Sequence, residues 1–188
     1  MSGERLFIAI PLPASLREEL AALYELMQSI AWTRPAQLHL TLRFLGDVDS
    51  ALGGPIESAL ARVQVEPFLL ALAGVGAFPP RGAARVIWIG IETSHPRLRQ
   101  LRQQIDDALL ATGLPLDVRI FHPHVTLGRV RKEAAPRAAT EFLKRHRDFA
   151  SAPFRADSFQ LFASELQPAG AVHTLKKEFR LVRHFKPV

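Results

Sequence analysis

The sequence predicts an α+β fold built from a duplicated unit: a bilobal protein whose two antiparallel sheets carry helices on their outer faces and enclose a central cleft. Strand-like segments follow one another in pairs, mixed with helices, which favours antiparallel sheets. Each half of the chain has the same order of helix, strand, helix, strand, strand. Two histidine-bearing strands, at positions 39 and 124, begin nearly half the chain apart, a spacing that indicates an internal duplication.

In the first half, alternation of polar and apolar residues predicts strands, and apolar positions at steps of three and four predict helices. A strand over Arg5–Leu12 is followed by a helix that Pro13 opens, with apolar positions continuing to Ile30. The further expected elements are a strand over Gln37–Gly46, a helix over Pro55–Val65, and strands over Phe68–Phe78 and Ala84–Glu92.

The second half repeats this order. Pro96 opens a helix that Gly113 closes, with Leu98, Leu101, Ile105 and Leu109 on one face. The elements after it are a strand over His122–Val130, a helix over Pro136–His146, and strands over Phe154–Ser164 and Val172–Val182. No long linker separates the halves, so we expect residues 1–188 to form a single two-lobed domain with one His-x-Thr strand in each lobe.

Length and composition exclude several classes of protein. With 188 residues, 48% hydrophobic and 22% charged, the chain can bury a core and is not a disordered segment. The absence of Cys excludes disulfide scaffolds, thiolate nucleophiles and Cys-ligated zinc. No apolar run approaches the ~20 residues of a membrane span, and the first residues lack a signal-peptide pattern. We therefore expect a cytoplasmic protein with no membrane partner.

The net charge of +6 lies in the second half of the chain. Lys and Arg outnumber Asp and Glu after residue 94, whereas acidic residues prevail before it. Most of the cations are Arg, whose planar guanidinium pairs with phosphate oxygens. This asymmetry indicates an anionic partner, with nucleic acid as the first candidate and a merely solvated basic face as the alternative.

The decisive pattern is His39-Leu40-Thr41-Leu42, matched by His124-Val125-Thr126-Leu127. Successive side chains of a strand point to opposite faces, so each His shares a face with the Thr two residues later. Two such strands side by side bring two imidazoles and two hydroxyls together. That set suits a phosphodiester, because one imidazole can accept a proton from water while the other protonates the leaving oxygen.

The two motifs and their surroundings resemble the two-histidine phosphoesterase superfamily, in particular its RNA 2′,3′-cyclic phosphodiesterases, also named 2′-5′ RNA ligases. The similarity extends through four blocks of the chain: residues 32–46 (WTRPAQLHLTLRFLG), 121–129 (FHPHVTLGR), 85–90 (RVIWIG) and 164–170 (SELQPAG). A departure is His173, where relatives usually carry tyrosine; it puts only a peripheral contact in doubt.

The resemblance implies metal-independent hydrolysis of a terminal RNA 2′,3′-cyclic phosphate to a 2′-phosphate, with no cofactor. It also implies reversible 2′-5′ RNA ligation through the same cyclic phosphate chemistry. It implies that His39 is the proton donor, that His124 is the proton acceptor, and that Thr41, Thr126 and Arg129 bind the substrate. The partner it implies is RNA with a cyclic phosphate end, tRNA-like or a small oligonucleotide. We expect the protein to be a monomer.

Strand alternation complicates two further residues. It places Arg129 and Phe44 on the strand face opposite the histidines. A bulge at Gly128 would redirect Arg129 toward them. Phe44 has no such glycine, so we interpret it as a core residue rather than as one that packs near the base or the histidines.

Two alternatives remain open from the sequence. His122 and His124 share one strand face and, with His39, would supply zinc ligands, although no carboxylate accompanies them and Pro123 interrupts the strand. A non-catalytic RNA-binding module would use the basic stretch but needs exposed aromatics and has no use for twin histidines. That stretch comprises Arg129, Arg131, Lys132, Arg137, Lys144, Arg145 and Arg147.

Overall fold

The structure, a computed structural model, describes residues 3–27, 29–92, 95–131, 136–167 and 170–182. This part of the chain forms an eight-stranded antiparallel sheet and a sheet of two short strands. In spatial order the large sheet contains β10 (Gly170–Arg180), β9 (Ser158–Gln167), β1 (Gly3–Pro11), β3 (His39–Asp49), β7 (His124–Val130), β6 (Val86–Ile91) and β5 (Leu72–Phe78), and β2 (Ile30–Trp32) also pairs with β7. The small sheet joins β4 (Phe68–Leu70) to β8 (Phe154–Ala156).

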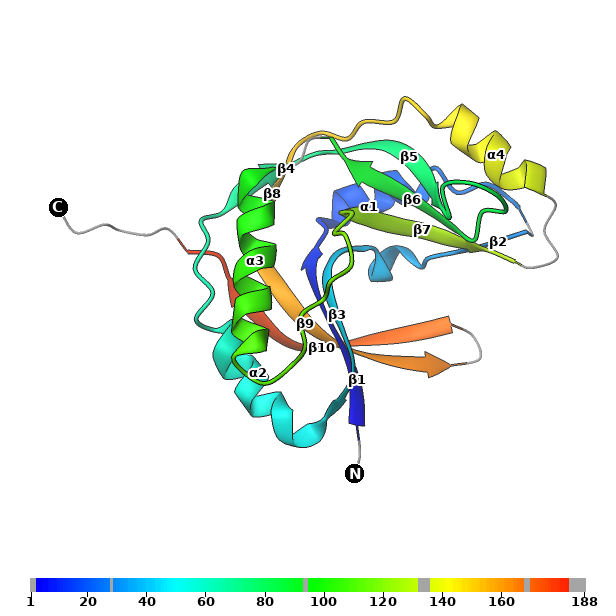
Figure 1. Cartoon of the computed structure of the whole chain (residues 1–188). Coiled ribbons are helices and arrows are strands. Elements are labelled where there is room, and N and C mark those ends of the chain that lie inside the picture. The colour runs from blue at the N-terminus through cyan, green and yellow to red at the C-terminus, as the bar shows by residue number, and fades with distance from the viewer. Residues whose placement is uncertain (1–2, 28, 93–94, 132–135, 168–169, 183–188) are drawn as a thin grey trace.

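The large sheet divides into two lobes between β3 and β7, which share a single residue pair, Leu40 with Val125. Strands β1, β9 and β10 continue from β3, whereas β6 and β5 continue from β7. The far end of β7 pairs instead with β2, where Ile30 lies opposite Val130. In Figure 1 the β7 group of strands lies above and the β1–β3–β9–β10 group below. The antiparallel α+β architecture with two lobes is thus confirmed.

The duplicated halves exchange their C-terminal hairpins. The β5–β6 hairpin, from the first half, pairs with β7 of the second half. The β9–β10 hairpin, from the second half, pairs with β1 of the first. Each lobe therefore contains one His-x-Thr strand and strands from both halves of the sequence.

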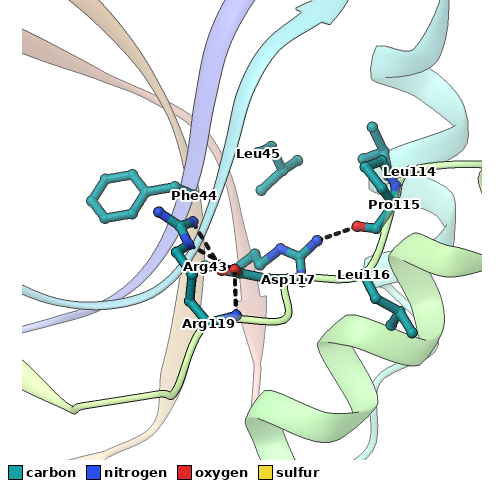
Figure 2. A pocket seen from close by; sticks show the side chains of 8 residues that line it. All are labelled: Arg43, Phe44, Leu45, Leu114, Pro115, Leu116, Asp117 and Arg119. Carbon is teal, nitrogen blue, oxygen red and sulfur yellow. Dashed lines mark hydrogen bonds and ion pairs between the residues drawn. The ribbon is translucent and has the colours of Figure 1, made fainter.

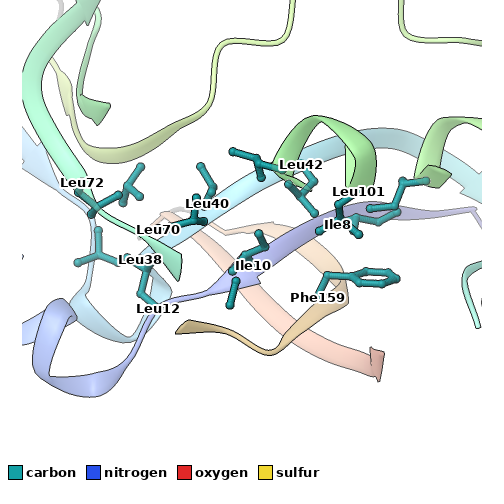
Figure 3. Packing of buried hydrophobic residues seen from close by; sticks show 14 of the residues in the cluster. Ile8, Ile10, Leu12, Leu38, Leu40, Leu42, Leu70, Leu72, Leu101 and Phe159 are labelled. Carbon is teal, nitrogen blue, oxygen red and sulfur yellow. The ribbon is translucent and has the colours of Figure 1, made fainter. Parts of the chain in front are cut away.

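Four α-helices of the described chain cover the sheet: α1 (Ala14–Ala21), α2 (Gly53–Leu60), α3 (Pro96–Leu110) and α4 (Pro136–Arg145). The apolar face predicted for α3 is confirmed, because Leu98, Leu101, Ile105 and Leu109 are all buried. Leu101 lies close to the apolar side chains of β1 and β3, as Figure 3 shows for Ile8 and Leu42. This packing fixes the face of β3 that carries Leu40, so its other face remains for the site.

The prediction that the first helix continues to Ile30 is wrong, because α1 ends at Ala21. Beyond it, side chains anchor the chain to the segment after β2: the Tyr24 hydroxyl donates to the Thr33 carbonyl at 2.8 Å, and Trp32 Nε1 donates to the Glu25 carbonyl at 2.8 Å. The Tyr24 and Trp32 rings also stack, with centroids 4.7 Å apart. Apolar residues at helical spacing therefore reach the core from a segment that is not helical.

The strands predicted as continuous over 68–78 and 154–164 are each interrupted, at Ala71 and at Asp157. Their short first parts become β4 and β8 and pair with each other, so that β5 and β9 can enter the two lobes of the large sheet. Other boundaries differ as well. Helix α2 covers Gly53–Leu60 rather than 55–65, and β3 covers His39–Asp49 rather than 37–46. Strand β7 begins at His124 rather than His122, and β10 covers Gly170–Arg180 rather than 172–182. Residues 168–169 of the block 164–170 lie outside the described residues.

Candidate active site

Strands β3 and β7 bring the two motifs onto one face of the sheet. Leu40 and Val125 are opposite each other and fully buried. Because the strands are antiparallel, this pair places the first residue of each motif beside the third residue of the other. Alternation then directs the polar side chains away from the core. The residues that share this face are His39, Thr41, His124 and Thr126.

Each motif is followed by a β-bulge at the same position. On β3, Ala9 pairs with Thr41 but Ile8 pairs with Arg43, which leaves Leu42 as the extra residue. On β7, Trp88 pairs with Thr126 but Ile87 pairs with Gly128, which leaves Leu127 as the extra residue. The two residues after each Thr are accordingly both buried. Because a bulge reverses the alternation, the third residue after each Thr turns back to the histidine face.

These bulges redirect Arg129 and Phe44. The bulge considered at Gly128 is present, and Arg129 lines the same cavity as His39. The interpretation of Phe44 as a core residue is wrong, because its side chain is 53% exposed and lines this cavity. Figure 2 shows the Phe44 ring pointing away from the Arg43 side chain, whose guanidinium donates to the Pro115 carbonyl. The signal in the sequence was the equal spacing of Phe44 and Arg129 from their histidines.

The backbone fixes the tautomer of both imidazoles. His39 Nδ1 lies 2.7 Å from the carbonyl oxygen of Gln37, and His124 Nδ1 lies 2.7 Å from that of His122. A carbonyl oxygen can only accept, so Nδ1 carries the hydrogen in each ring. Nε2 is therefore the nitrogen available to accept or donate a proton at the substrate.

Burial holds both imidazoles in the neutral form when no substrate is bound. Desolvation lowers the pKa of His39 to about 4, and the neighbouring His173 and His124 act in the same direction, while the hydrogen bond to Gln37 opposes them. Burial likewise lowers the pKa of His124. A phosphate anion between the rings would raise both pKa values, because it stabilises the charged form. Proton donation by either residue thus depends on the bound substrate.

His173 on β10 is a third imidazole beside the site, not the peripheral contact expected from the sequence. Its ring centroid lies 5.4 Å from that of His39 in an edge-to-face arrangement and 4.8 Å from that of Phe7. The hairpin that carries it is tied to the turn before His39, because Gln37 Nε2 donates to the Ala171 carbonyl at 2.6 Å. This contact and the pairing of β9 with β1 place His173 here, so alternation within one strand could not reveal it.

On the other lobe, His124 packs among aromatic rings. The centroids of Phe78 and Trp88 lie 5.1 and 6.0 Å from its own, and that of His122 lies 6.1 Å away. His122 is exposed and contributes its carbonyl to hold the His124 ring. The backbone of His122 thus contributes to the orientation of the His124 ring.

A cavity of about 310 Å³ lies between the lobes. Its lining includes Gln37 and the β3 residues His39, Thr41 and Phe44, but not His124. The other lining residues are grouped by the lobe that carries them into two walls. One wall comprises Arg5, Leu6, Phe7, Ser164, Ala171 and His173; the other comprises Ala31, Trp32, Thr33, Arg34, Thr126 and Arg129. No Asp or Glu of the described chain lines it, and within that part Arg5, Arg34 and Arg129 form no ion pair. The cavity is thus suited to an anion.

The chain matches the model of the 2′-5′ RNA ligase superfamily over residues 13–167. It belongs to this superfamily. Among curated relatives, the RNA 2′,3′-cyclic phosphodiesterase of Methanocaldococcus jannaschii is 30% identical over 93% of this chain and 99% of its own length. The protein of the same name from Thermus thermophilus is 35% identical over 94% of this chain and 90% of its own length.

Solved structures of the superfamily have the same fold. The crystal structure of TT0787 of Thermus thermophilus superposes with a TM-score of 0.78 at 27% identity, covering 94% of this chain and 97% of that one. Escherichia coli LigT complexed with 3′-AMP superposes with a TM-score of 0.77 at 25% identity, covering 96% and 99%. The similarity thus includes both lobes.

Membership in the 2′-5′ RNA ligase superfamily bears on the two alternatives. A binding module alone is not favoured, because the curated relatives of this chain are named as RNA 2′,3′-cyclic phosphodiesterases. Of the basic stretch proposed for such a module, Lys132 lies outside the described residues. In the part of the chain that the structure describes, no three His, Cys, Asp or Glu side chains are grouped to hold a metal ion.

No described helix is long and apolar enough to cross a membrane.

Proposed function

We propose that this member of the superfamily is an RNA 2′,3′-cyclic phosphodiesterase, which hydrolyses the terminal cyclic phosphate of RNA to a 2′-phosphate. The observation that carries the proposal is the pair of imidazoles on the neighbouring strands β3 and β7: His39 lines the cationic cavity, and backbone carbonyls hold both His39 and His124 in the same tautomer. The curated relatives with that activity in their names support the choice of substrate. No metal or cofactor is required.

In this mechanism the two histidines act on opposite sides of the phosphorus. His124 Nε2 accepts a proton from water as the new P–O bond forms, and His39 Nε2 donates a proton to the 3′ oxygen as the P–O3′ bond breaks. His39 is charged before reaction because the bound phosphate raises its pKa from the low value of the free protein. Solvent then returns a proton to His39 and removes one from His124. The assignment of the 3′ oxygen to His39 follows the resemblance to the superfamily.

Thr41, Thr126 and Arg129 bind the phosphoryl oxygens. All three line the cavity with His39, and the bulge after Thr126 directs the Arg129 side chain to it. The hydroxyls and the guanidinium donate to the charge that develops on these oxygens during the reaction. Their donors replace the positive charge that a metal ion supplies in other phosphoesterases.

The substrate class is RNA with a 2′,3′-cyclic phosphate end, of tRNA-like or small oligonucleotide size. We propose that residues 1–188 act as one two-lobed domain, as a monomer and in the cytoplasm. The same two histidines would catalyse 2′-5′ ligation when the 5′ hydroxyl of a second RNA replaces water: His124 accepts the proton of that hydroxyl as the P–O5′ bond forms, and His39 protonates the 3′ oxygen as the P–O3′ bond breaks.

The test is incubation of the purified protein with an RNA oligonucleotide that ends in a 2′,3′-cyclic phosphate, with the product identified by ³¹P NMR. We expect a 2′-phosphate, formed equally well in excess chelator. His39→Ala and His124→Ala should each lower turnover by at least ~10². The control is His95→Asn, which changes a histidine at the N-cap of α3 for another good capping residue. A 3′-phosphate product, loss of activity in chelator, or an active His39→Ala would contradict the proposal.

A further inference from the structure

We propose that Arg5 binds the phosphodiester that precedes the terminal nucleotide, so that the protein selects oligonucleotides over cyclic mononucleotides. This inference rests on the proposed function and extends it to the rest of the RNA chain. Its basis is the arrangement of charge in the cavity.

The cavity holds more positive charge than the reacting phosphate can neutralise. A cyclic phosphodiester carries one negative charge, which Arg129 and the two threonines match. Arg5 and Arg34 also line the cavity, and neither forms an ion pair within the described part of the chain. Three cations in one cavity without a carboxylate repel one another, and a ligand with more than one phosphate relieves that repulsion.

The catalytic roles indicate on which side the RNA continues. In-line displacement requires the leaving oxygen and the attacking water to lie on opposite sides of phosphorus. The leaving oxygen belongs to the ribose and faces His39, so the nucleoside lies against the wall that contains Phe7 and His173. Arg5 is the arginine of that wall, whereas Arg34 and Arg129 belong to the wall of Thr126. The phosphate on the 5′ side of the terminal ribose is therefore nearest Arg5.

The local structure of β1 leaves the Arg5 side chain available. Arg5 and Phe7 share one face of the strand because they are two residues apart. Asp47 is the cross-strand neighbour of Arg5, yet the two side chains form no ion pair. Arg5 is exposed, and Ser164 lines the cavity on the same side. A phosphate bound here thus displaces no internal partner of Arg5.

The experiment compares three substrates: a nucleoside 2′,3′-cyclic phosphate, a dinucleotide ending in a 2′,3′-cyclic phosphate, and the same dinucleotide with an uncharged methylphosphonate linkage. For the unsubstituted protein we expect kcat/KM to be ~10-fold or more higher for the charged than for the uncharged dinucleotide, as for a charge-assisted hydrogen bond. Arg5→Gln should remove this difference, and Arg5→Lys should retain part of it. Arg34→Gln and the distant control Arg62→Gln should keep the ratio.

The outcomes separate this inference from the proposed function. An unchanged ratio in Arg5→Gln with a native unfolding curve, or no difference between the two dinucleotides in the unsubstituted protein, would overturn the role of Arg5. If Arg34→Gln, rather than Arg5→Gln, abolished the higher kcat/KM for the charged dinucleotide, the nucleoside would lie against the opposite wall. That result would also overturn the role of Arg5. Hydrolysis of the cyclic mononucleotide would leave the proposed function standing in each case. If the unsubstituted protein hydrolysed none of the three substrates, the proposed function itself would be rejected.

Discussion

An alanine at Gly128 tests whether the bulge in β7 depends on a residue without a side chain. A Cβ atom at this position would lie 2.9 Å from Ile30 Cγ2, 3.0 Å from Trp32 Cε3 and 3.1 Å from the Ala31 carbonyl oxygen. The last of these is backbone of β2, so the strand itself must move. Overpacking of this kind costs about 1–3 kcal/mol. Because Trp32 lines the cavity and Arg129 follows the substituted residue, kcat/KM should fall as well.

Urea unfolding followed by tryptophan fluorescence gives the free energy of unfolding of Gly128→Ala, and cyclic phosphate hydrolysis gives kcat/KM. The matched control is Gly54→Ala in α2, where an added Cβ meets no atom within 4 Å. There the higher helix propensity of alanine should stabilise the protein by up to about 1 kcal/mol. If Gly128→Ala and Gly54→Ala unfolded at the same urea concentration and with the same slope, the steric argument would be refuted. A destabilised Gly128→Ala with unchanged kcat/KM would refute the connection to the site.

Two further predictions concern the imidazole and hydroxyl groups. The pKa of His39 is about 4 in the folded protein and 6.5 for a free side chain, so the unfolded chain binds more protons between these values and stability should fall as the pH decreases from about 6.5 to 4. The free energy of unfolding, measured in urea at pH 7 and at pH 4.5, should decrease less in His39→Gln than in the unsubstituted protein. The difference between the two decreases should be at most about 3 kcal/mol. An identical decrease in both proteins would contradict the burial argument. Thr41→Val and Thr126→Val should each lower kcat/KM by ~10-fold to 10³-fold at unchanged stability. The exposed Thr174→Val serves as control, and an equal effect there would contradict the proposed contacts.

The parts of the fold that the sequence predicts are those governed by local periodicity. In α3, every third or fourth residue is apolar and meets the sheet, so the helix and its buried face follow from the sequence alone. The two His-x-Thr strands were predictable for the same reason, since Leu40 and Val125 must be buried if the polar residues face a cleft. The duplication also limited the possible arrangements, because it required both motifs to occupy equivalent places.

The remaining features depend on contacts between segments distant in the sequence. The early end of α1 follows from the bonds of Tyr24 and Trp32, and the hairpin exchange follows from which strand each hairpin meets. His173 reaches His39 because the β9–β10 hairpin is tied to Gln37, more than 130 residues earlier in the chain. Alternation within one strand carries no information about such contacts.

The paired bulges also explain how a duplicated motif can bind an asymmetric substrate. Both strands read His-x-Thr-Leu-x and then place the next side chain in the cavity, yet that residue is Phe44 in one lobe and Arg129 in the other. An aromatic ring suits the nucleoside, and a guanidinium suits the phosphoryl oxygens. In the proposed function this difference favours one orientation of the substrate, with its ribose toward His39, although the two imidazoles are held by equivalent hydrogen bonds. We infer that this difference between the lobes, together with the His173 ring beside His39, gives the two histidines their separate roles as acid and base.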